Sequence, residues 1–326
     1  MRYRRLRRTG MLASEIGFGT WGLGGVRGGA VGYGPTDDAE SVRALRRAYE
    51  QGVTFFDTAD LYGRGHSEAL LGRALAEVRQ RVVLATKAGF LDADGAQDFS
   101  VGHLAAALEG SLRRLRTSYV DLFQLHSPPL DLLQSDPAVL RWLLALKETG
   151  RARAVGVSVR APADGIVVAR HYEVDALQVN FNLADQRAVT SGLLDLCAAR
   201  GIGVIVRTPL CFGFLTGAFG NAAFVESDHR SRWPAEQRRR WHEASALFAR
   251  CRAGDPRQTP AQFALRYCLS YPGVWTVIPG MLTVRQVEEN VRASDLGPLS
   301  GEERRQAERL AEGQEFFLGR RARIKV

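Results

Sequence analysis

The sequence predicts an α/β protein, a (β/α)8 TIM barrel with an N-terminal β-hairpin and extra helices. Three observations favour this fold: eight apolar, strand-like runs lie along the 326 residues, each is followed by a stretch of helical periodicity, and no linker divides the chain. We therefore expect a single barrel domain over residues 1–326.

The strands are expected where apolar and β-branched side chains cluster. Residues 3–18 alternate like a short hairpin, and the barrel strands follow it. In residues 53–57 the strand signal is a run of Val, Thr and two Phe that ends on an aspartate. The eight expected strands are 16–20, 53–57, 82–87, 120–125, 153–158, 176–180, 203–207 and 275–278.

The helices are expected where apolar positions recur every three to four residues, as they do at Leu104, Leu108, Leu112 and Leu115. Three of them end on the tripeptides EQG, ETG and ARG, because glycine accepts the left-handed conformation that closes a helix. The eight expected helices are 37–51, 67–78, 101–116, 136–149, 161–171, 191–200, 259–270 and 284–294.

Three segments do not fit the eightfold pattern. Residues 208–235 are too long for a plain connection and indicate a functional loop. Residues 236–252 and the segment from Ser300 predict additional helical structure. A doubly wound sheet would also alternate strands and helices, but the glycines of GFGTWGLGG lack the fingerprint spacing and the immediate helix that such a sheet carries.

Composition excludes several classes of function. The net charge is +9, but only three of the 44 basic residues are lysine, and the arginine clusters at residues 4–8, 238–240 and 320–323 lack the interleaved aromatics of a single-strand binder. The four cysteines have no metal-ligand spacing, and we expect them to be reduced. No signal peptide or apolar run of 18 residues occurs. We expect a cytoplasmic monomer or small homo-oligomer that binds no nucleic acid, membrane or metal.

Chemistry is concentrated where consecutive barrel strands end. Asp57 ends the second strand, Lys87 the third and His126 the fourth, and Tyr62 lies in the loop after the second. Each alone has an ordinary structural explanation: a turn cap, a surface charge, a core histidine or a packing ring. Together they indicate a site, because strand ends of a barrel point their side chains toward one place on its axis.

These four residues could together protonate a carbonyl oxygen. Tyrosine, with a pKa near 10, is a weak acid at neutral pH, and a nearby ammonium lowers that pKa by ~1–3 units. Lys87 could supply the ammonium and Asp57 its counter-charge. His126 could donate a hydrogen bond that directs the substrate oxygen. We therefore expect Lys87 to hold the pKa of Tyr62 below its ordinary value.

The sequence resembles the aldo-keto reductases over nearly its whole length. The motifs that carry the resemblance are YRRLRRTGMLASEIGFGTWGLGG, GVTFFDTADLYGRGHSEALLGRAL, TKAGF, YVDLFQLHSP, GVSV, DALQVNFNL, VIVRTPL and VIPGMLTVRQVEENV, in family order. The resemblance implies a barrel enzyme that passes a hydride from NADPH or NADH to a carbonyl group, with a small-molecule carbonyl substrate. It assigns the catalytic roles to Asp57, Tyr62, Lys87 and His126, and the substrate pocket to Trp21, Tyr62 and His126.

The same resemblance implies the cofactor contacts. They fall on Gly19, Thr20, Trp21, Asp57, Ser158, Gln178, Arg207, Thr208, Pro209, Leu210, Gly213, Leu215, Thr216, Gly280, Leu282, Gln286, Glu289 and Asn290. The chain departs from the family at Val159, where Asn usually completes the carboxamide site, and at Arg207, where many members stack a tyrosine on the nicotinamide. It also has Leu282 near the place where relatives that use NADPH carry Arg or Lys. We expect NADPH, with NADH possible.

Three functions are compatible with this resemblance. The first is a carbonyl reductase, and the second is a sugar or lactol dehydrogenase that runs the same chemistry in reverse. The third is a cofactor-sensing regulatory subunit of a channel with little turnover, which a turnover measurement would distinguish. We expect the loops at 24–34, 90–99 and 210–233 and the C-terminal segment to select the substrate.

Overall fold

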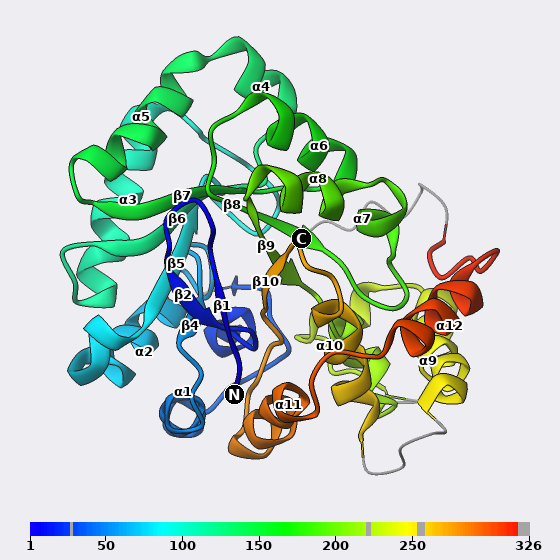
Figure 1. The fold of residues 1–326 in the computed structure, drawn as a ribbon. Helices are drawn as coiled ribbons and strands as arrows, with labels where there is room; N and C mark the ends of the chain where they lie inside the picture. The colour runs from blue at the N-terminus through cyan, green and yellow to red at the C-terminus, as the bar shows by residue number, and fades with distance from the viewer. Residues whose placement is uncertain (27–28, 220–222, 253–257, 319–326) are drawn as a thin grey trace.

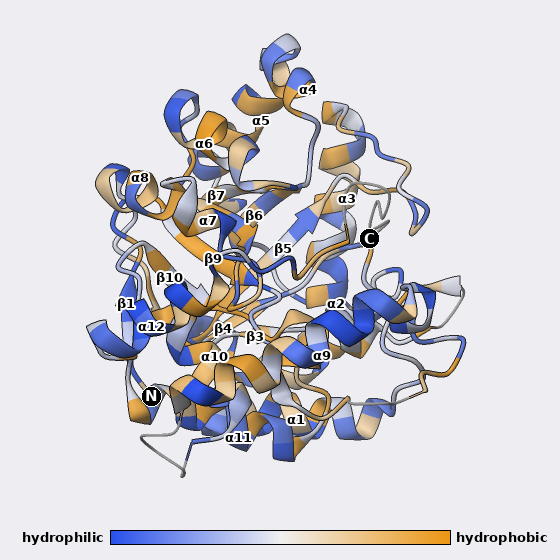
Figure 2. Ribbon diagram, turned by 90° about the vertical axis from the view of Figure 1, so that its right-hand side faces the viewer, coloured by the Kyte–Doolittle hydropathy of each residue, from blue (hydrophilic) through white to orange (hydrophobic). Residues whose placement is uncertain are grey.

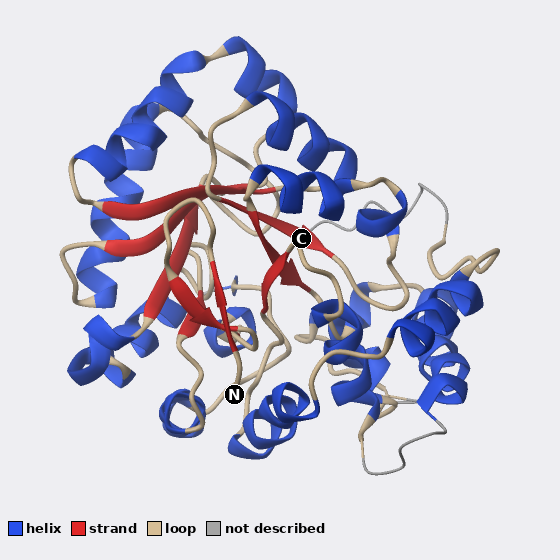
Figure 3. Ribbon diagram, in the orientation of Figure 1, coloured by secondary structure: helices blue, strands red, loops and turns tan. Residues whose placement is uncertain are grey.

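The computed structural model describes residues 1–26, 29–219, 223–252 and 258–318, so the basic cluster predicted at 320–323 lies outside the described residues. Eight parallel strands form a nearly closed barrel inside a layer of helices (Figure 3). The predicted fold class is therefore confirmed.

Each barrel strand pairs in parallel with the next strand along the chain. The last strand closes the ring onto the first: the Gly17 amide donates to the Val277 carbonyl at 2.8 Å, and the Gly19 amide to the Pro279 carbonyl at 3.0 Å. All eight predicted strands are present, within a few residues. They are β3 (Phe18–Gly19), β4 (Phe55–Asp57), β5 (Val83–Ala88), β6 (Val120–His126), β7 (Ala152–Ser158), β8 (Ala176–Asn180), β9 (Gly203–Arg207) and β10 (Val274–Val277).

The N-terminal hairpin closes one end of the barrel. Its strands are β1 (Tyr3–Arg5) and β2 (Leu12–Ser14), and Figure 1 shows it in blue, lying across the barrel strands. Leu6, Met11 and Ala13 from this hairpin join Phe55 and Trp275 in the core cluster inside the barrel. Because the hairpin fills the amino-terminal end, the strand ends that carry the polar residues form the open end.

The helices cover the outside of the barrel, and those after the barrel strands agree with the prediction. They are α1 (Asp38–Glu50), α2 (His66–Ala74), α3 (Val101–Leu115), α5 (Pro137–Glu148), α6 (Pro162–His171), α8 (Leu193–Arg200), α10 (Pro260–Leu269) and α11 (Val284–Leu296). Two differ in detail. The second ends early and continues as the 3-10 helix η3 (Ala76–Arg81). The predicted helix 191–200 begins later, at α8, because Gly192 adopts a left-handed conformation with φ 75° after α7 (Arg187–Thr190).

Further helices lie outside the eightfold pattern, as predicted. They are α9 (Ala235–Ala249), followed by η6 (Arg250–Arg252), and α12 (Gly301–Ala311), and α12 packs beside α9 in Figure 1. The short α4 (Leu130–Ser135) was not predicted. The predicted long loop contains two 3-10 turns, η4 (Cys211–Thr216) and η5 (His229–Arg232), and a third, η1 (Trp21–Gly24), follows β3.

Apolar side chains fill two layers of core. One lies inside the barrel and a larger one lies between the strands and the helices; Figure 2 shows the hydrophobic colour concentrated on the central strands. The four cysteines are buried and unbridged. Within the described part of the chain, no helix could cross a membrane, and no group of His, Cys, Asp or Glu side chains is arranged to hold a metal ion.

Candidate active site

The centre of the open barrel end is an ion pair between neighbouring strands. Asp57 is the last residue of β4 and Lys87 lies near the end of β5, and Lys87 Nζ donates to Asp57 Oδ1 at 2.5 Å and to the Thr58 carbonyl at 2.8 Å. Lys87 is 0% and Asp57 2% exposed. Burial disfavours the Lys87 ammonium, but the Asp57 carboxylate and the Tyr62 hydroxyl outweigh it and raise the pKa of Lys87 above its ordinary value.

Two buried glutamine side chains hold the other oxygen of Asp57. Gln178 Nε2 on β8 donates to Oδ2 at 2.9 Å, and Gln124 Nε2 on β6 donates to it at 3.3 Å. The carboxylate therefore receives hydrogen bonds from three barrel strands, which fixes its orientation. Gln178 thus supports Asp57, a contact that the sequence did not predict.

Tyr62 is placed by a close approach of two loop backbones. A Cβ atom on Gly24 would lie 2.6 Å from the Gly63 amide nitrogen, and one on Gly63 would lie 2.5 Å from the Gly24 carbonyl oxygen. Gly63 also has a positive φ of 59°. These glycines let the loop after β4 pack against the loop after β3, which brings the half-buried Tyr62 ring over Lys87 with Nζ 5.1 Å from the ring centroid.

The expected pKa of Tyr62 was wrong in sign. Burial raises the pKa of Tyr62 above its ordinary value, and the Lys87 ammonium, the next largest influence, lowers it without cancelling the effect of burial. Asp57 raises the pKa further, whereas the Arg207 guanidinium lowers it. Lys87 therefore makes Tyr62 a stronger acid than burial alone would allow, but not stronger than a tyrosine in water.

His126 lies beside Tyr62 at the end of β6. Its ring centroid is 5.9 Å from that of Tyr62 and 4.8 Å from that of Phe90, both edge to face. Burial, together with the charges of Lys87 and Arg207, lowers the pKa of His126 well below its ordinary value of 6.5. The imidazole is therefore neutral at neutral pH, with one ring nitrogen as a donor. Its Nδ1 atom is buried without a hydrogen-bond partner among the described residues.

Arg207 spans the ends of three strands. It lies at the end of β9, where Nε donates to Asn180 Oδ1 at 2.8 Å, Nη1 to Ser158 Oγ at 2.9 Å and Nη2 to the Val159 carbonyl at 2.9 Å. The guanidinium is thus fixed beside Ser158, the residue expected to hold a carboxamide. Val159, which stands where Asn usually completes the carboxamide site, has a side chain that is only 3% exposed and therefore occupies an apolar position.

Thr20 supports the neighbouring strand end. Its hydroxyl donates to the Asp57 carbonyl at 2.9 Å, and Ser67 Oγ on α2 donates to Thr20 Oγ1 at 2.7 Å. Gly19 allows β3 to close the barrel, because a Cβ atom there would lie 2.6 Å from the Ile278 carbonyl oxygen. Gly280 forms a parallel β-bridge with Gly19 where the chain after β10 meets β3. These residues therefore hold together the closure of the barrel beside Asp57.

Aromatic side chains form a wall next to these residues. The ring of Trp21 is 4.9 Å from that of Tyr33 and 4.6 Å from that of His229, in edge-to-face contacts. The His229 amide donates to the Gly32 carbonyl at 3.0 Å, and Arg230 pairs with the buried Asp228 at 2.6 Å. The described parts of the predicted substrate loops 24–34 and 210–233 therefore pack against each other; residues 27–28 and 220–222 lie outside the description.

The loop after β9 has an unusual backbone. Thr208, Cys211 and Phe212 have φ of 53°, 46° and 56°, and Gly213 has φ 92°. Within this loop the Cys211 amide donates to the Thr208 carbonyl at 2.9 Å, and the Gly213 amide to the Leu210 carbonyl at 2.9 Å. Thr216 stabilises the turn by donating from Oγ1 to the Gly213 carbonyl at 2.7 Å. Pro209 and Leu210 complete this loop, and Leu210 is buried.

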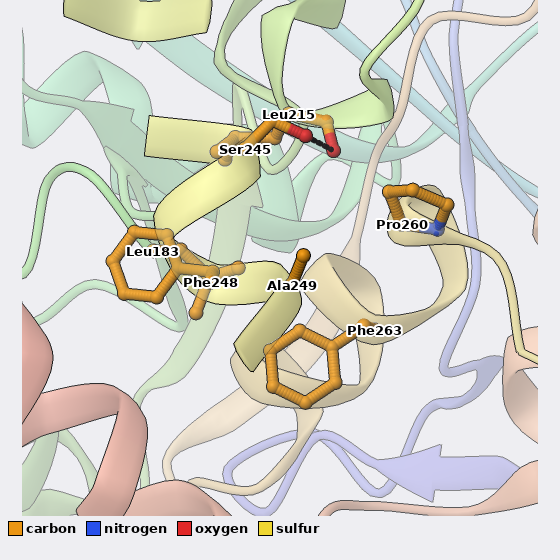
Figure 4. A pocket seen from close by; sticks show the side chains of 7 residues that line it. All are labelled: Leu183, Leu215, Ser245, Phe248, Ala249, Pro260 and Phe263. Atoms are coloured by element: carbon orange, nitrogen blue, oxygen red, sulfur yellow. Dashed lines mark hydrogen bonds between the residues drawn. The ribbon is translucent and has the colours of Figure 1, made fainter. Parts of the chain in front are cut away.

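A small hollow lies behind this loop and is not part of the polar site. It is lined by Leu183, Leu215, Ser245, Phe248, Ala249, Pro260 and Phe263 (Figure 4). Its one polar side chain is Ser245, whose hydroxyl donates to the Leu215 carbonyl at 3.4 Å. The hollow therefore supports the loop and offers no polar group to a ligand.

The start of α11 is already occupied by side chains of the protein. Glu40 Oε1 on α1 accepts from the Val284 amide at 3.1 Å, and Gln286 Oε1 accepts from the Leu282 amide at 2.6 Å. Asn290 is buried further along α11, and the Glu289 carbonyl accepts from Gln262 Nε2 at 2.9 Å. Glu40 is itself paired with Arg43 at 2.6 Å, so this helix start carries both a carboxylate and a guanidinium.

The structure brings the four expected catalytic residues together with Ser158, Gln178 and Arg207 at the open end of the barrel. Gln286, Glu289 and Asn290 lie apart from them on α11. Gln124, Asn180 and Glu40 were not predicted from the sequence. Gln124 and Asn180 lie two residues from His126 and Gln178 on the same strand faces, a spacing that could have found them.

The chain matches the model of the Aldo/keto reductase family over residues 15–312. It is 32% identical over 301 residues to aldo-keto reductase YhdN of Bacillus subtilis, covering 88% of this chain and 87% of the relative.

Two solved structures are similar in fold. The glycerol dehydrogenase from Gluconobacter oxydans has a TM-score of 0.78 at 28% identity and covers 94% of both chains. An aldo/keto reductase from Klebsiella pneumoniae, solved in complex with NADP and acetate, has a TM-score of 0.70 at 27% identity and covers 95% of this chain and 96% of its own.

Proposed function

Because the chain belongs to the aldo/keto reductase family and is an oxidoreductase of that family, we propose that it reduces an aldehyde or ketone to an alcohol with Tyr62 as the general acid. The observation that carries the proposal is the buried Asp57 and Lys87 pair beneath the Tyr62 ring. That arrangement brings a phenol, an ammonium and a neutral imidazole together at the open end of the barrel.

Each residue has a distinct role in this proposal. Tyr62 donates its hydroxyl proton to the carbonyl oxygen of the substrate, and Lys87 stabilises the phenolate that results. Asp57 keeps Lys87 charged, and Gln124 and Gln178 hold Asp57 in place. His126, neutral at neutral pH, donates a hydrogen bond that orients the substrate oxygen. Trp21 and the neighbouring aromatic rings exclude water from the reaction.

The cofactor of this reaction is NADPH, with NADH as a second hydride donor. The bound nicotinamide supplies a hydride to the carbonyl carbon, which is the chemistry that the protein side chains lack. The related Klebsiella pneumoniae enzyme in complex with NADP supports this assignment. Ser158, Gln178 and Arg207 would hold the nicotinamide end, the loop of Thr208 to Thr216 the pyrophosphate, and α11 the adenosine end.

A second candidate is the reverse reaction, oxidation of a sugar, lactol or simple alcohol. The similarity to a glycerol dehydrogenase favours it, and the same side chains serve both directions. One domain over residues 1–326, a cytoplasmic location and a monomer or small homo-oligomer stay predictions.

A substrate screen tests the proposed function. The purified chain is incubated with aldehydes, ketones and sugars in the presence of NADPH or NADH, and with alcohols in the presence of the oxidised cofactors, and the nicotinamide absorbance is followed. Turnover that disappears in Tyr62→Phe is the expected result. Tight cofactor binding without turnover on every substrate class would favour the regulatory subunit instead.

A further inference from the structure

Arg207 carries a positive charge that forms no ion pair with a carboxylate among the described residues. Its three hydrogen-bond acceptors, Asn180 Oδ1, Ser158 Oγ and the Val159 carbonyl, are all uncharged. A guanidinium remains charged in proteins, because its pKa lies far above neutrality. It is half-buried at the barrel mouth, where an unpaired charge is unfavourable.

The nearby carboxylates are committed to other cations. Asp57 is paired with Lys87 at 2.5 Å, and Asp185 is paired with Arg187 at 2.6 Å. Within the described ranges, no carboxylate forms an ion pair with Arg207. His126 and Tyr62 are neutral at neutral pH, so Asp57, Lys87 and Arg207 carry two positive charges and one negative charge among them.

This charge lies close to the reaction centre. Arg207 Nη1 donates to Ser158 Oγ at 2.9 Å, and Ser158 pairs with His126 in the register of β6 and β7, so the guanidinium lies near the residue that faces the substrate carbonyl in the proposed function. Hydride transfer requires the nicotinamide ring to contact the same carbonyl carbon that Tyr62 activates. The ring must therefore lie within the field of Arg207, whatever its detailed pose.

We propose that the unpaired charge of Arg207 makes the protein bind the reduced nicotinamide cofactor more tightly than the oxidised one. The oxidised ring carries a positive charge and the reduced ring is neutral, so Arg207 repels only the oxidised form. The inference rests on the proposed function, because it assumes that a nicotinamide occupies the site.

The consequence concerns binding of the cofactor. Arg207 cannot change the equilibrium of the reaction in solution, but while Tyr62 is neutral it favours the complex of the protein with the reduced cofactor over the complex with the oxidised one.

The test compares dissociation constants of the full-length protein for NADP+ and NADPH, measured by quenching of tryptophan fluorescence. Arg207→Gln removes the charge, whereas Arg207→Lys keeps the charge and loses the fork of donors. Arg153→Gln, at the opposite end of the barrel on β7, is the matched control. The NAD+ and NADH pair is titrated in parallel, because the effect of Arg207 does not depend on the 2′-phosphate.

The ratio of Kd for the oxidised cofactor to Kd for the reduced one is expected to fall by about tenfold in Arg207→Gln. It should stay near the parent value in Arg207→Lys and Arg153→Gln. An unchanged ratio in Arg207→Gln overturns the inference, as does a Lys variant that behaves like the Gln variant, since hydrogen bonding rather than charge would then be responsible.

A further variant tests the inference without removing Arg207, whose loss could affect folding. Asn180→Asp is nearly isosteric and places a carboxylate at the Arg207 Nε contact, now 2.8 Å, so the charge is neutralised while the arginine stays. The ratio should fall in this variant too, and an unchanged ratio contradicts the inference. If the parent binds neither form of either cofactor, the proposed function fails; if it binds them with ratios insensitive to these variants, only this inference fails.

Discussion

Lys87 Nζ lies 2.5 Å from Asp57 Oδ1 with both side chains almost fully buried, beneath the ring of Tyr62. A buried ion pair that lacks further hydrogen bonds contributes little to stability, because desolvation offsets the attraction. Here Gln124, Gln178 and the Thr58 carbonyl complete the hydrogen bonding. The pair therefore holds one ammonium next to one phenol, and this relationship gives the site its chemistry.

Replacing Lys87 with Met should raise the pKa of Tyr62 further, because burial would then act without the opposing ammonium. We expect kcat to fall by roughly 10²–10⁴-fold, and the basic limb of the pH profile of kcat/KM to move to higher pH. Lys87→Arg is the control, since it retains the positive charge. A basic limb at the parent pH in Lys87→Met would show that Lys87 does not influence Tyr62.

Asp60 should make stability depend on pH. Burial, with a smaller contribution from Glu68, raises the pKa of Asp60 from 3.8 to about 7. The folded state then retains a proton that the unfolded state loses, so this stabilising contribution is present below pH 3.8 and is lost as pH rises toward 7.

Asp60→Asn removes this dependence. The Tm of the variant minus the Tm of the parent should therefore be more positive at pH 8 than at pH 4. The exposed Asp94→Asn serves as the control in the same melting experiments. An identical Tm difference at both pH values would contradict the raised pKa of Asp60.

Gly63→Ala should displace Tyr62 more than it destabilises the barrel. The added Cβ would lie 2.5 Å from the Gly24 carbonyl oxygen, and a left-handed alanine costs about 1–2 kcal/mol. We expect a large loss of kcat and a Tm lowered by a few degrees. Gly95→Ala, also at positive φ but with no neighbour within 4 Å, is the matched control. If both variants lose activity equally, the contact between the two loops does not position Tyr62.

The choice between NADPH and NADH should depend on the start of α11. Leu282→Arg should tighten NADPH by roughly tenfold to a hundredfold, because an arginine binds the 2′-phosphate bidentately, and leave NADH unchanged. Glu40→Gln should also tighten NADPH selectively, since it removes the carboxylate that accepts from the Val284 amide.

Titration of both cofactors by fluorescence checks this prediction, with Glu50→Gln on the same helix as the control. The alternative is that the exposed Arg285 already reaches the phosphate. Arg285→Ala would then weaken NADPH selectively, and Leu282→Arg would add little. Equal effects on NADPH and NADH in every variant would mean that the adenosine end lies elsewhere.

The sequence predicted the barrel because each strand, buried on both faces, is a short apolar run followed by helical periodicity. It predicted Asp57, Lys87 and His126 because polar residues that end such runs are conspicuous. The sequence could not predict the contact of Glu40 with Val284, since 244 residues separate them. It also could not give the sign of the Tyr62 pKa shift, because burial depends on the loops that cover the ring.

The proposed function depends on Tyr62 donating the proton to the substrate. Tyr62→Phe removes one hydroxyl and retains the ring against His126, so the fold and cofactor binding should persist. The most direct measurement is kcat of this variant on the best substrate from the screen, alongside Kd for NADPH. We expect kcat to fall by roughly 10²–10⁴-fold at unchanged Kd. A kcat equal to that of the parent would contradict it.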